Sequence, residues 1–183
     1  RVMVFFGKYK CTIKENGFFW VNPFYEKKKI TLRARNLDVP PIKVNDKVGN
    51  PVMIGLVLVW RLKDTYKAMF DIDSSSLAMP AINTSDKQHP SAVNIAGGAL
   101  MGRMNNFERF VKIQSDSALR SVAGLYAYDN QENGDEVTLR SGNKLVNERL
   151  EEELTNRLSI AGMEVVEARI NYLAYASEIA GVM

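Results

Sequence analysis

The order of apolar and polar residues divides the chain into a front part with strand periodicity and a back part with mostly helical periodicity. The apolar run Val2–Phe6 ends at Gly7, and charged and less polar residues alternate over 8–14. Asn16-Gly17 is typical of a two-residue hairpin turn, because both residues tolerate positive φ. Phe18–Val21 is therefore predicted to return as a strand.

Further along, the same period of two continues. Ile30–Arg35 alternates, and Pro40-Pro41 marks a sheet edge or a crossing point because proline donates no ladder hydrogen bond. After a turn over 45–51, Val52–Leu62 is the most hydrophobic segment and is predicted to be a central strand covered on both faces. Val165–Ile170 is predicted to be the last strand.

The period then changes to that of helices. Asp64 is a good cap for a short helix over 66–70, and 106–126 is predicted to be a long helix. Ser141 is expected to cap a second long helix that ends at Gly162. The apolar stripes expected on these two helices are Phe107, Val111, Ala118, Val122 and Leu125 on the first, and Val146, Leu150, Leu154 and Leu158 on the second.

A block of strands, then helices and a late strand, predicts an α+β domain: an antiparallel, partly curled sheet packed against several helices. Residues 74–105 are rich in serine, proline and glycine and are expected to form a loop-rich insertion. A partner-binding loop, a lid over the sheet and a spacer are all open roles for that insertion.

The stretch from Phe18 to Tyr25 holds five aromatic residues in eight positions and is followed by three lysines. Apolar side chains beside a cationic patch suit the boundary of an anionic membrane, although the same residues could be a buried strand and turn with basic flanks. Strand alternation would place Phe19 and Val21 on one face, so about half of the aromatic rings are expected in the core. The candidate membrane-contact residues are Phe18, Trp20, Phe24, Tyr25, Lys27, Lys28 and Lys29.

Charge is distributed unevenly along the 183 residues. Residues 1–72 hold 14 Lys/Arg and 6 Asp/Glu, whereas 73–183 hold 10 and 15, within an overall net charge of +3. A basic front half and an acidic back half would favour two different partners or head-to-tail packing of identical copies. Glu151, Glu152 and Glu153 are the candidate self-assembly residues, and a solvated helix face is the alternative.

The sequence shows no positioned set of residues for catalysis. The chain has one cysteine, Cys11, and one histidine, His89, so neither an internal disulfide nor a cysteine metal site can form. Ser115 and Ser117 have no histidine in a recognisable context. We therefore expect no enzyme, no cofactor, no metal and no small-molecule substrate. Aromatic rings beside Arg33 and Arg35 could stack on the bases of a nucleic acid. Nucleic-acid binding is nevertheless not expected, because the back half of the chain is acidic.

Several segments, in their order along the chain, resemble the SPFH or band 7 family of stomatins, prohibitins and flotillins. The resemblance is closest to a bacterial, flotillin-like branch. By this resemblance, we expect residues 1–175 to form the SPFH domain and residues 176–183 to be the start of a truncated C-terminal helix. The segments that carry it are Gly17–Phe24, Val44–Pro51, Trp60–Thr65, Ala68–Phe70, Val111–Arg120, Leu150–Gly162, Val166–Ile170 and Leu173–Ala176.

This resemblance implies an architecture more than a chemistry. Such proteins are membrane-associated scaffolds that self-assemble, continue into a coiled coil, and organise or regulate membrane proteins such as membrane-bound proteases. An anchor would precede Arg1, and the basic front half favours the cytoplasmic face, where anionic lipid lies. The alternative is a soluble protein- or nucleic-acid-binding module without membrane contact.

Overall fold

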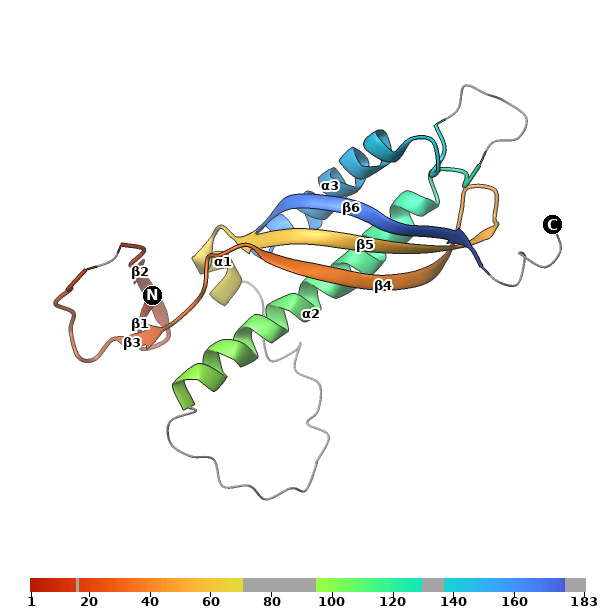
Figure 1. Ribbon diagram of the computed structural model, residues 1–183. Coiled ribbons are helices and arrows are strands. Elements are labelled where there is room, and N and C mark those ends of the chain that lie inside the picture. Colours follow the sequence, from red (N-terminus) through yellow and green to blue (C-terminus); the bar gives the residue numbers. More distant parts are fainter. Residues whose placement is uncertain (16, 71–94, 130–136, 177–183) are drawn as a thin grey trace, which may run out of the picture.

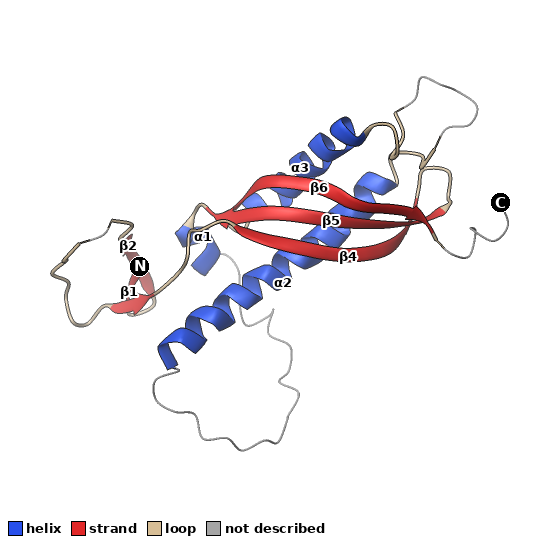
Figure 2. Ribbon diagram, in the orientation of Figure 1, coloured by secondary structure: helices blue, strands red, loops and turns tan. Residues whose placement is uncertain are grey.

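Two separate three-stranded antiparallel sheets form the framework of the protein, and the two long helices lie on one side of the larger sheet (Figures 1 and 2). A computed structural model describes residues 1–15, 17–70, 95–129 and 137–176. The predicted α+β class, with antiparallel strands packed against helices, is confirmed, but the strands form two sheets where one partly curled sheet was predicted. The larger sheet and its helices make up the main body, and the smaller sheet lies at one end of it.

The larger sheet has the order β4 (Arg35–Asn45), β5 (Pro51–Leu62), β6 (Met163–Tyr175). As predicted, β5 is central, and its even-numbered side chains from Val52 to Leu62 are buried under the helices. Its other face is only half-covered at Met53, Val57 and Val59, so coverage on both faces was a wrong prediction. The reason is that both long helices pack on the same side.

Both edges of this sheet are modified in ways that stop regular strand pairing. On β4, Pro40 and Pro41 coincide with a register shift between Val39 and Ile42, which confirms the predicted edge. On β6, the backbone N–H groups of Ala168 and Ile170 donate to side chains of the neighbouring helix α3 (Asn143–Ser159), at 3.0 and 3.2 Å. Side chains of α3 thus occupy two backbone donors of β6 that an uncovered edge strand would present to a strand of another molecule.

Helices α1 and α3 follow the predicted caps with one exception. Asp64 Oδ1 accepts the N–H groups of Tyr66 and Lys67 at the start of α1 (Thr65–Phe70). On α3 the cap residue is Gly142 instead of Ser141, because the Ser141 hydroxyl is hydrogen-bonded to Thr138. The four stripe residues of α3, Val146, Leu150, Leu154 and Leu158, are all fully buried, as expected.

Gly162 ends the α3 turn as predicted, with φ at +66°. A Cβ there would lie 2.4 Å from the carbonyl oxygen of Asp64. This close approach lets the Gly162 carbonyl accept the N–H groups of Lys63 and Asp64, which joins the start of β6 to the end of β5.

Helix α2 (Ile95–Ala123) begins earlier than its sequence suggested. Residues 95–105 of the predicted loop-rich insertion are helical, and the remainder of that insertion from 74 to 94 lies outside the described residues, as does His89. Burial of Met104 and Phe107 shows why: packing on the sheet outweighs the low helix propensity of Gly97 and Gly98. Leu125 is half-exposed because the helix ends at Ala123.

The smaller sheet has the order β2 (Lys8–Thr12), β1 (Val2–Phe5), β3 (Glu26–Lys28). Its hairpin turn is Phe6-Gly7, with φ of 44° and 78°, the signs of a type I′ turn. The predicted strand at Phe18–Val21 is wrong, because these residues form a loop and β1 takes β3 as its second neighbour. Asn16 of the predicted turn lies outside the described residues.

The segment between the two sheets is irregular. The predicted strand over Ile30–Arg35 is wrong apart from Arg35, where β4 begins. Ile30 and Leu32 are nevertheless half-buried against the main core, so the alternation that suggested a strand reflects packing of a linker.

Asp46 organises the β4–β5 turn at the opposite end of the main body. Its carboxylate accepts the N–H groups of Val48, Asn50 and Tyr128 at 2.7 to 3.0 Å. Burial by itself would raise the pKa of Asp46, but these backbone donors outweigh it and hold the pKa below its ordinary value. One side chain therefore closes the turn and ties it to the chain after α2.

The core prediction can be checked on one helix. Leu154→Ala should lower the free energy of unfolding by about 2–5 kcal/mol, because it leaves a cavity beneath β5 and β6. Leu145→Ala on the exposed face of α3 is the matched control and should change it by less than about 0.5 kcal/mol. Urea denaturation followed by circular dichroism measures both, and equal losses would contradict the packing.

The Asp46 network predicts a pH-dependent loss. Asp46→Asn should cost about 1–3 kcal/mol at neutral pH, because Asn cannot accept on both sides as the carboxylate does. With a lowered folded-state pKa, the ionised group stabilises the fold above the unfolded-state value of about 3.9, and this contribution is lost as the pH falls further. The gap in unfolding free energy between wild type and variant should therefore narrow in acid. A gap that stays constant with pH would contradict the network.

A candidate membrane-contact site at the end of the molecule

Large aromatic side chains stand in solvent at the free end of the smaller sheet. Phe18 and Trp20 are fully exposed, with relative exposures of 109% and 103%, and Phe24 reaches 76%. Phe6 at the β1–β2 turn is 87% exposed, and Phe19 is about half-exposed. Single exposed apolar residues are ordinary, but five large rings on one small sheet and its loop form a feature that calls for a partner.

The expectation that about half of these rings fill the core is wrong. Phe18, Phe19, Trp20 and Phe24 all lie outside the hydrophobic core, and Tyr25 is only half-buried. The physical reason is that the segment from 17 to 25 connects β2 to β3 as a loop and has no strand partner to pack its alternate faces.

Local contacts hold the end of this loop. Asn22 Oδ1 accepts the N–H of Phe24 at 3.0 Å, and the Asn22 carbonyl accepts that of Tyr25. The Tyr25 ring meets Phe5 edge to face at 5.4 Å, and Phe5 meets Phe6 in the same way at 4.6 Å. The contact between Tyr25 and Phe5 thus anchors the end of the loop, while Phe24 on the loop and Phe6 on the neighbouring β1–β2 turn remain exposed.

Phe6 is the member of this group that the sequence analysis missed. Its apolar neighbours assigned it to the strand Val2–Phe6, whereas it is the first residue of the turn. The following Gly7 was the available signal, because a glycine with positive φ at the end of a strand marks a turn.

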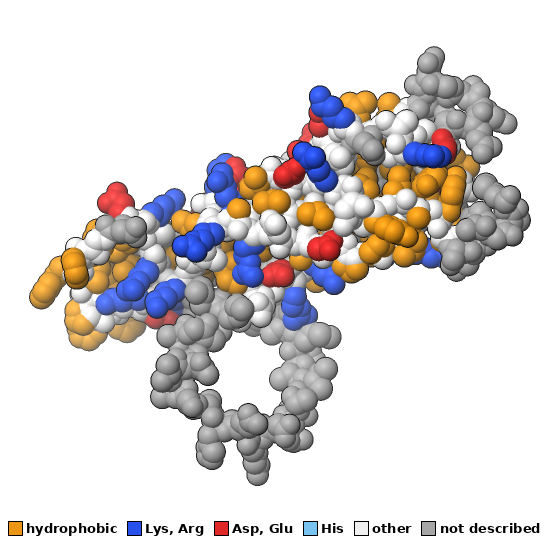
Figure 3. Space-filling view, viewed as in Figure 1, with side chains coloured by type: hydrophobic (Ala, Val, Ile, Leu, Met, Phe, Trp, Pro, Cys, Tyr) orange, Lys and Arg blue, Asp and Glu red, His pale blue; other side chains and the backbone are white. Residues whose placement is uncertain are grey.

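The cationic residues share this end of the molecule. Lys27 and Lys29 are exposed at β3, and Lys28 is half-buried and pairs with Glu26 at 3.5 Å. Figure 3 shows hydrophobic and basic side chains side by side on the smaller sheet, away from the main body. We call the group Phe6, Phe18, Phe19, Trp20 and Phe24, with Lys27 and Lys29, the aromatic tip.

The arrangement suits adsorption to a surface. Rings and ammonium groups on the same end can enter an interface together, with the rings below the headgroups and the lysines at their level. Within the described ranges, no group of three or more His, Cys, Asp or Glu side chains could hold a metal ion. No helix among the described residues is long and apolar enough to cross a bilayer.

A family comparison decides what kind of domain carries this tip. The model of the SPFH domain / Band 7 family matches residues 1–183. The chain belongs to this family. Its members are in general non-enzymatic, membrane-associated scaffolds that oligomerise. A comparison with curated protein sequences found no match.

The acidic candidates of this SPFH domain lie on α3 and have partners within the chain. Glu151 accepts the N–H of Ala168, Glu153 pairs with Arg157 at 2.7 Å, and Glu152 pairs with Arg149 at 2.6 Å. Glu152 is exposed, whereas the other two are half-buried. Glu151 and Glu153 therefore have roles within the fold, and Glu152 with its neighbour Glu148 is the exposed part of the acidic face.

Proposed function

We propose that this SPFH domain is a scaffold that attaches to anionic membranes through the aromatic tip. The observation that carries the proposal is the full exposure of Phe18 and Trp20 beside Lys27 and Lys29. Phe18 and Trp20 lie on the loop between β2 and β3, at the end of the molecule that the smaller sheet forms (Figure 1), so they can reach a surface without any change in the main body.

The magnitudes favour reversible attachment. Burying one large apolar side chain contributes about 1.5–3 kcal/mol, and each lysine near an anionic surface about 1 kcal/mol. Only part of each ring leaves water at an interface, so one tip alone binds weakly. Several copies on one membrane would bind far more tightly, which links membrane attachment to self-assembly.

The scaffold proposal extends to partners. The assembled domain would organise or regulate membrane proteins, with membrane-bound proteases as one class of client. The basic front half supports a position on the cytoplasmic face of the membrane, where anionic lipid lies. A soluble binding module is the alternative, and the vesicle experiment below separates the two.

Flotation with anionic vesicles tests the tip. The double change Phe18→Ser with Trp20→Ser should weaken binding at least tenfold, because loss of about 1.4 kcal/mol of burial is a factor of ten. The matched control is Ile113→Ser with Ile160→Ser, two exposed apolar residues of the main body, and it should bind as wild type does. Vesicle-induced blue shift of tryptophan emission, absent in Trp20→Phe, gives an independent readout.

Charge gives the second arm of that test. Lys27→Gln with Lys29→Gln should weaken binding and reduce its dependence on salt, whereas Lys112→Gln on α2 should not. Equal binding by the tip variants and wild type would exclude the tip as the membrane contact and favour a soluble module.

We also propose that the exposed acidic residues of α3 meet the basic N-terminal part of a second copy. Glu148→Lys with Glu152→Lys should then weaken self-association measured by sedimentation velocity, and added Lys8→Glu with Lys10→Glu, at exposed positions of β2 outside the aromatic tip, should restore it. Circular dichroism should show unchanged folding, because neither glutamate is buried. Self-association that is unaffected by the charge change, or not restored by the swap, would contradict this interface.

A further inference from the structure

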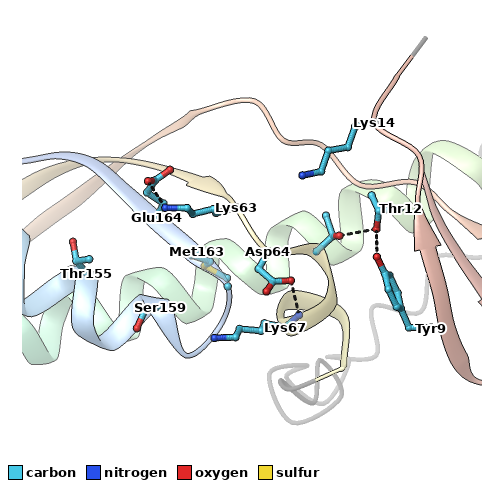
Figure 4. A pocket seen from close by; sticks show the side chains of 12 residues that line it. Tyr9, Thr12, Lys14, Lys63, Asp64, Lys67, Thr155, Ser159, Met163 and Glu164 are labelled. Carbon is cyan, nitrogen blue, oxygen red and sulfur yellow. Dashed lines mark hydrogen bonds and ion pairs between the residues drawn. The ribbon is translucent and has the colours of Figure 1, made fainter. Parts of the chain in front are cut away.

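A cavity of about 620 Å³ lies where the smaller sheet meets the main body. Its walls come from the end of β2, from the β5–α1 junction, and from the end of α3 with the following turn (Figure 4). The polar groups that line it include Thr12, Lys14, Lys63, Lys67, Thr155 and Ser159.

The two parts of the molecule touch at this cavity through a short polar chain. The Thr12 hydroxyl is hydrogen-bonded to that of Thr65 at 2.7 Å and to that of Tyr9 at 3.0 Å. The Tyr9 ring meets Tyr66 edge to face at 5.3 Å. In the part of the chain that the structure describes, no strand of the smaller sheet pairs with the larger one, so these side chains and the linker through Ile30 and Leu32 connect the two sheets.

The charges around the cavity do not cancel. Glu164 is already matched by Arg61 at 2.7 Å and Lys63 at 3.0 Å. The hydrogen bonds from Arg61 and then Lys63 lower the pKa of Glu164, so it is ionised at neutral pH. Asp64 Oδ1 accepts backbone N–H groups of α1.

Because Lys63 is paired with Glu164, the two other lysines that line the cavity are its remaining source of positive charge. Lys14 enters from the smaller sheet and Lys67 from α1, as Figure 4 shows. Among the described residues, neither ammonium group has an ion-pair partner. Both are exposed, and therefore charged and able to reorient toward a bound anion.

We propose that this cavity binds a phosphate group between Lys14 and Lys67, carried either by a lipid headgroup or by a soluble phosphate compound. Figure 4 shows Lys14 and Lys67 on opposite sides of Asp64, so both flexible side chains would turn into the cavity to meet one phosphate. Charge-assisted hydrogen bonds from two ammonium groups to phosphate oxygens are the strong ones. Lys14 directly precedes the loop that bears the aromatic tip, so a headgroup source lies within reach when the tip is on a membrane.

The bound phosphate would act as a bridge. Because Lys14 belongs to the smaller sheet and Lys67 to the main body, an anion held by both would tie the two parts together. Such a site goes beyond attachment through the aromatic tip, since the tip can contact a membrane with the cavity empty.

Titration of the isotope-labelled domain with inorganic phosphate at constant ionic strength tests the site by NMR. We expect saturable shifts of the backbone amides of Thr12, Lys14 and Lys67. Lys14→Gln with Lys67→Gln should weaken binding at least tenfold, whereas the control Lys8→Gln with Lys10→Gln, which removes the same charge from exposed positions of β2, should not. Absent or non-saturable shifts, or equal weakening in both variants, would overturn the proposal.

The source of the phosphate is assigned in a second arm, in the background of Phe18→Ser with Trp20→Ser, so that binding by the tip is weakened. Vesicles with phosphatidic acid are compared with vesicles with phosphatidylserine at equal surface charge. Preference for phosphatidic acid that is lost in Lys14→Gln with Lys67→Gln supports a lipid headgroup, and phosphate binding without that preference supports a soluble ligand. The solution titration decides the cavity site even if the tip makes no membrane contact.

Discussion

The packing of one face of β5 on the leucine stripe of α3 and on α2 is the constraint on which the rest of the molecule depends. Both long helices lie on the same side of the larger sheet. Leu56, Leu58 and Trp60 of β5 are buried on the sheet side of this layer, and Leu150 and Leu154 of α3 are buried on its helix side. Buried apolar area of this kind is the dominant favourable term in folding. Because it is satisfied entirely within the main body, the first thirty or so residues contribute little to that core and form a small sheet of their own.

That separation explains the character of the candidate site. A three-stranded sheet with a short apolar core of its own, around Val2, Met3 and Val4, cannot bury a long aromatic loop. The rings of Phe18 and Trp20 therefore remain in solvent and are available to an external apolar surface. The same separation leaves a joint between two parts, and the polar cavity with its lysines lies at that joint.

Local signals in the sequence were sufficient for most of the main body. A continuous apolar run identified β5, a four-residue repeat identified the buried face of α3, and the caps at Asp64 and Gly162 have local chemical causes. The errors fall where local and tertiary effects disagree. Phe18–Val21 was predicted to be a returning strand but forms a loop, and α2 runs through Gly97 and Gly98 as the first turns of a helix whose Met104 and Phe107 are buried in the core.

By itself, the sequence determined the class of fold, the strands and helices of the core, and the residues that carry the aromatic and basic character of the N-terminal end. Periodicity and composition are local properties, so they can be read from a single chain. Tertiary structure alone decided that the rings of Phe18 and Trp20 are exposed, that Phe6 joins them, and that Lys14 and Lys67 line one cavity. Exposure and proximity depend on which surfaces pack against each other over long sequence distances, and no local pattern records that choice.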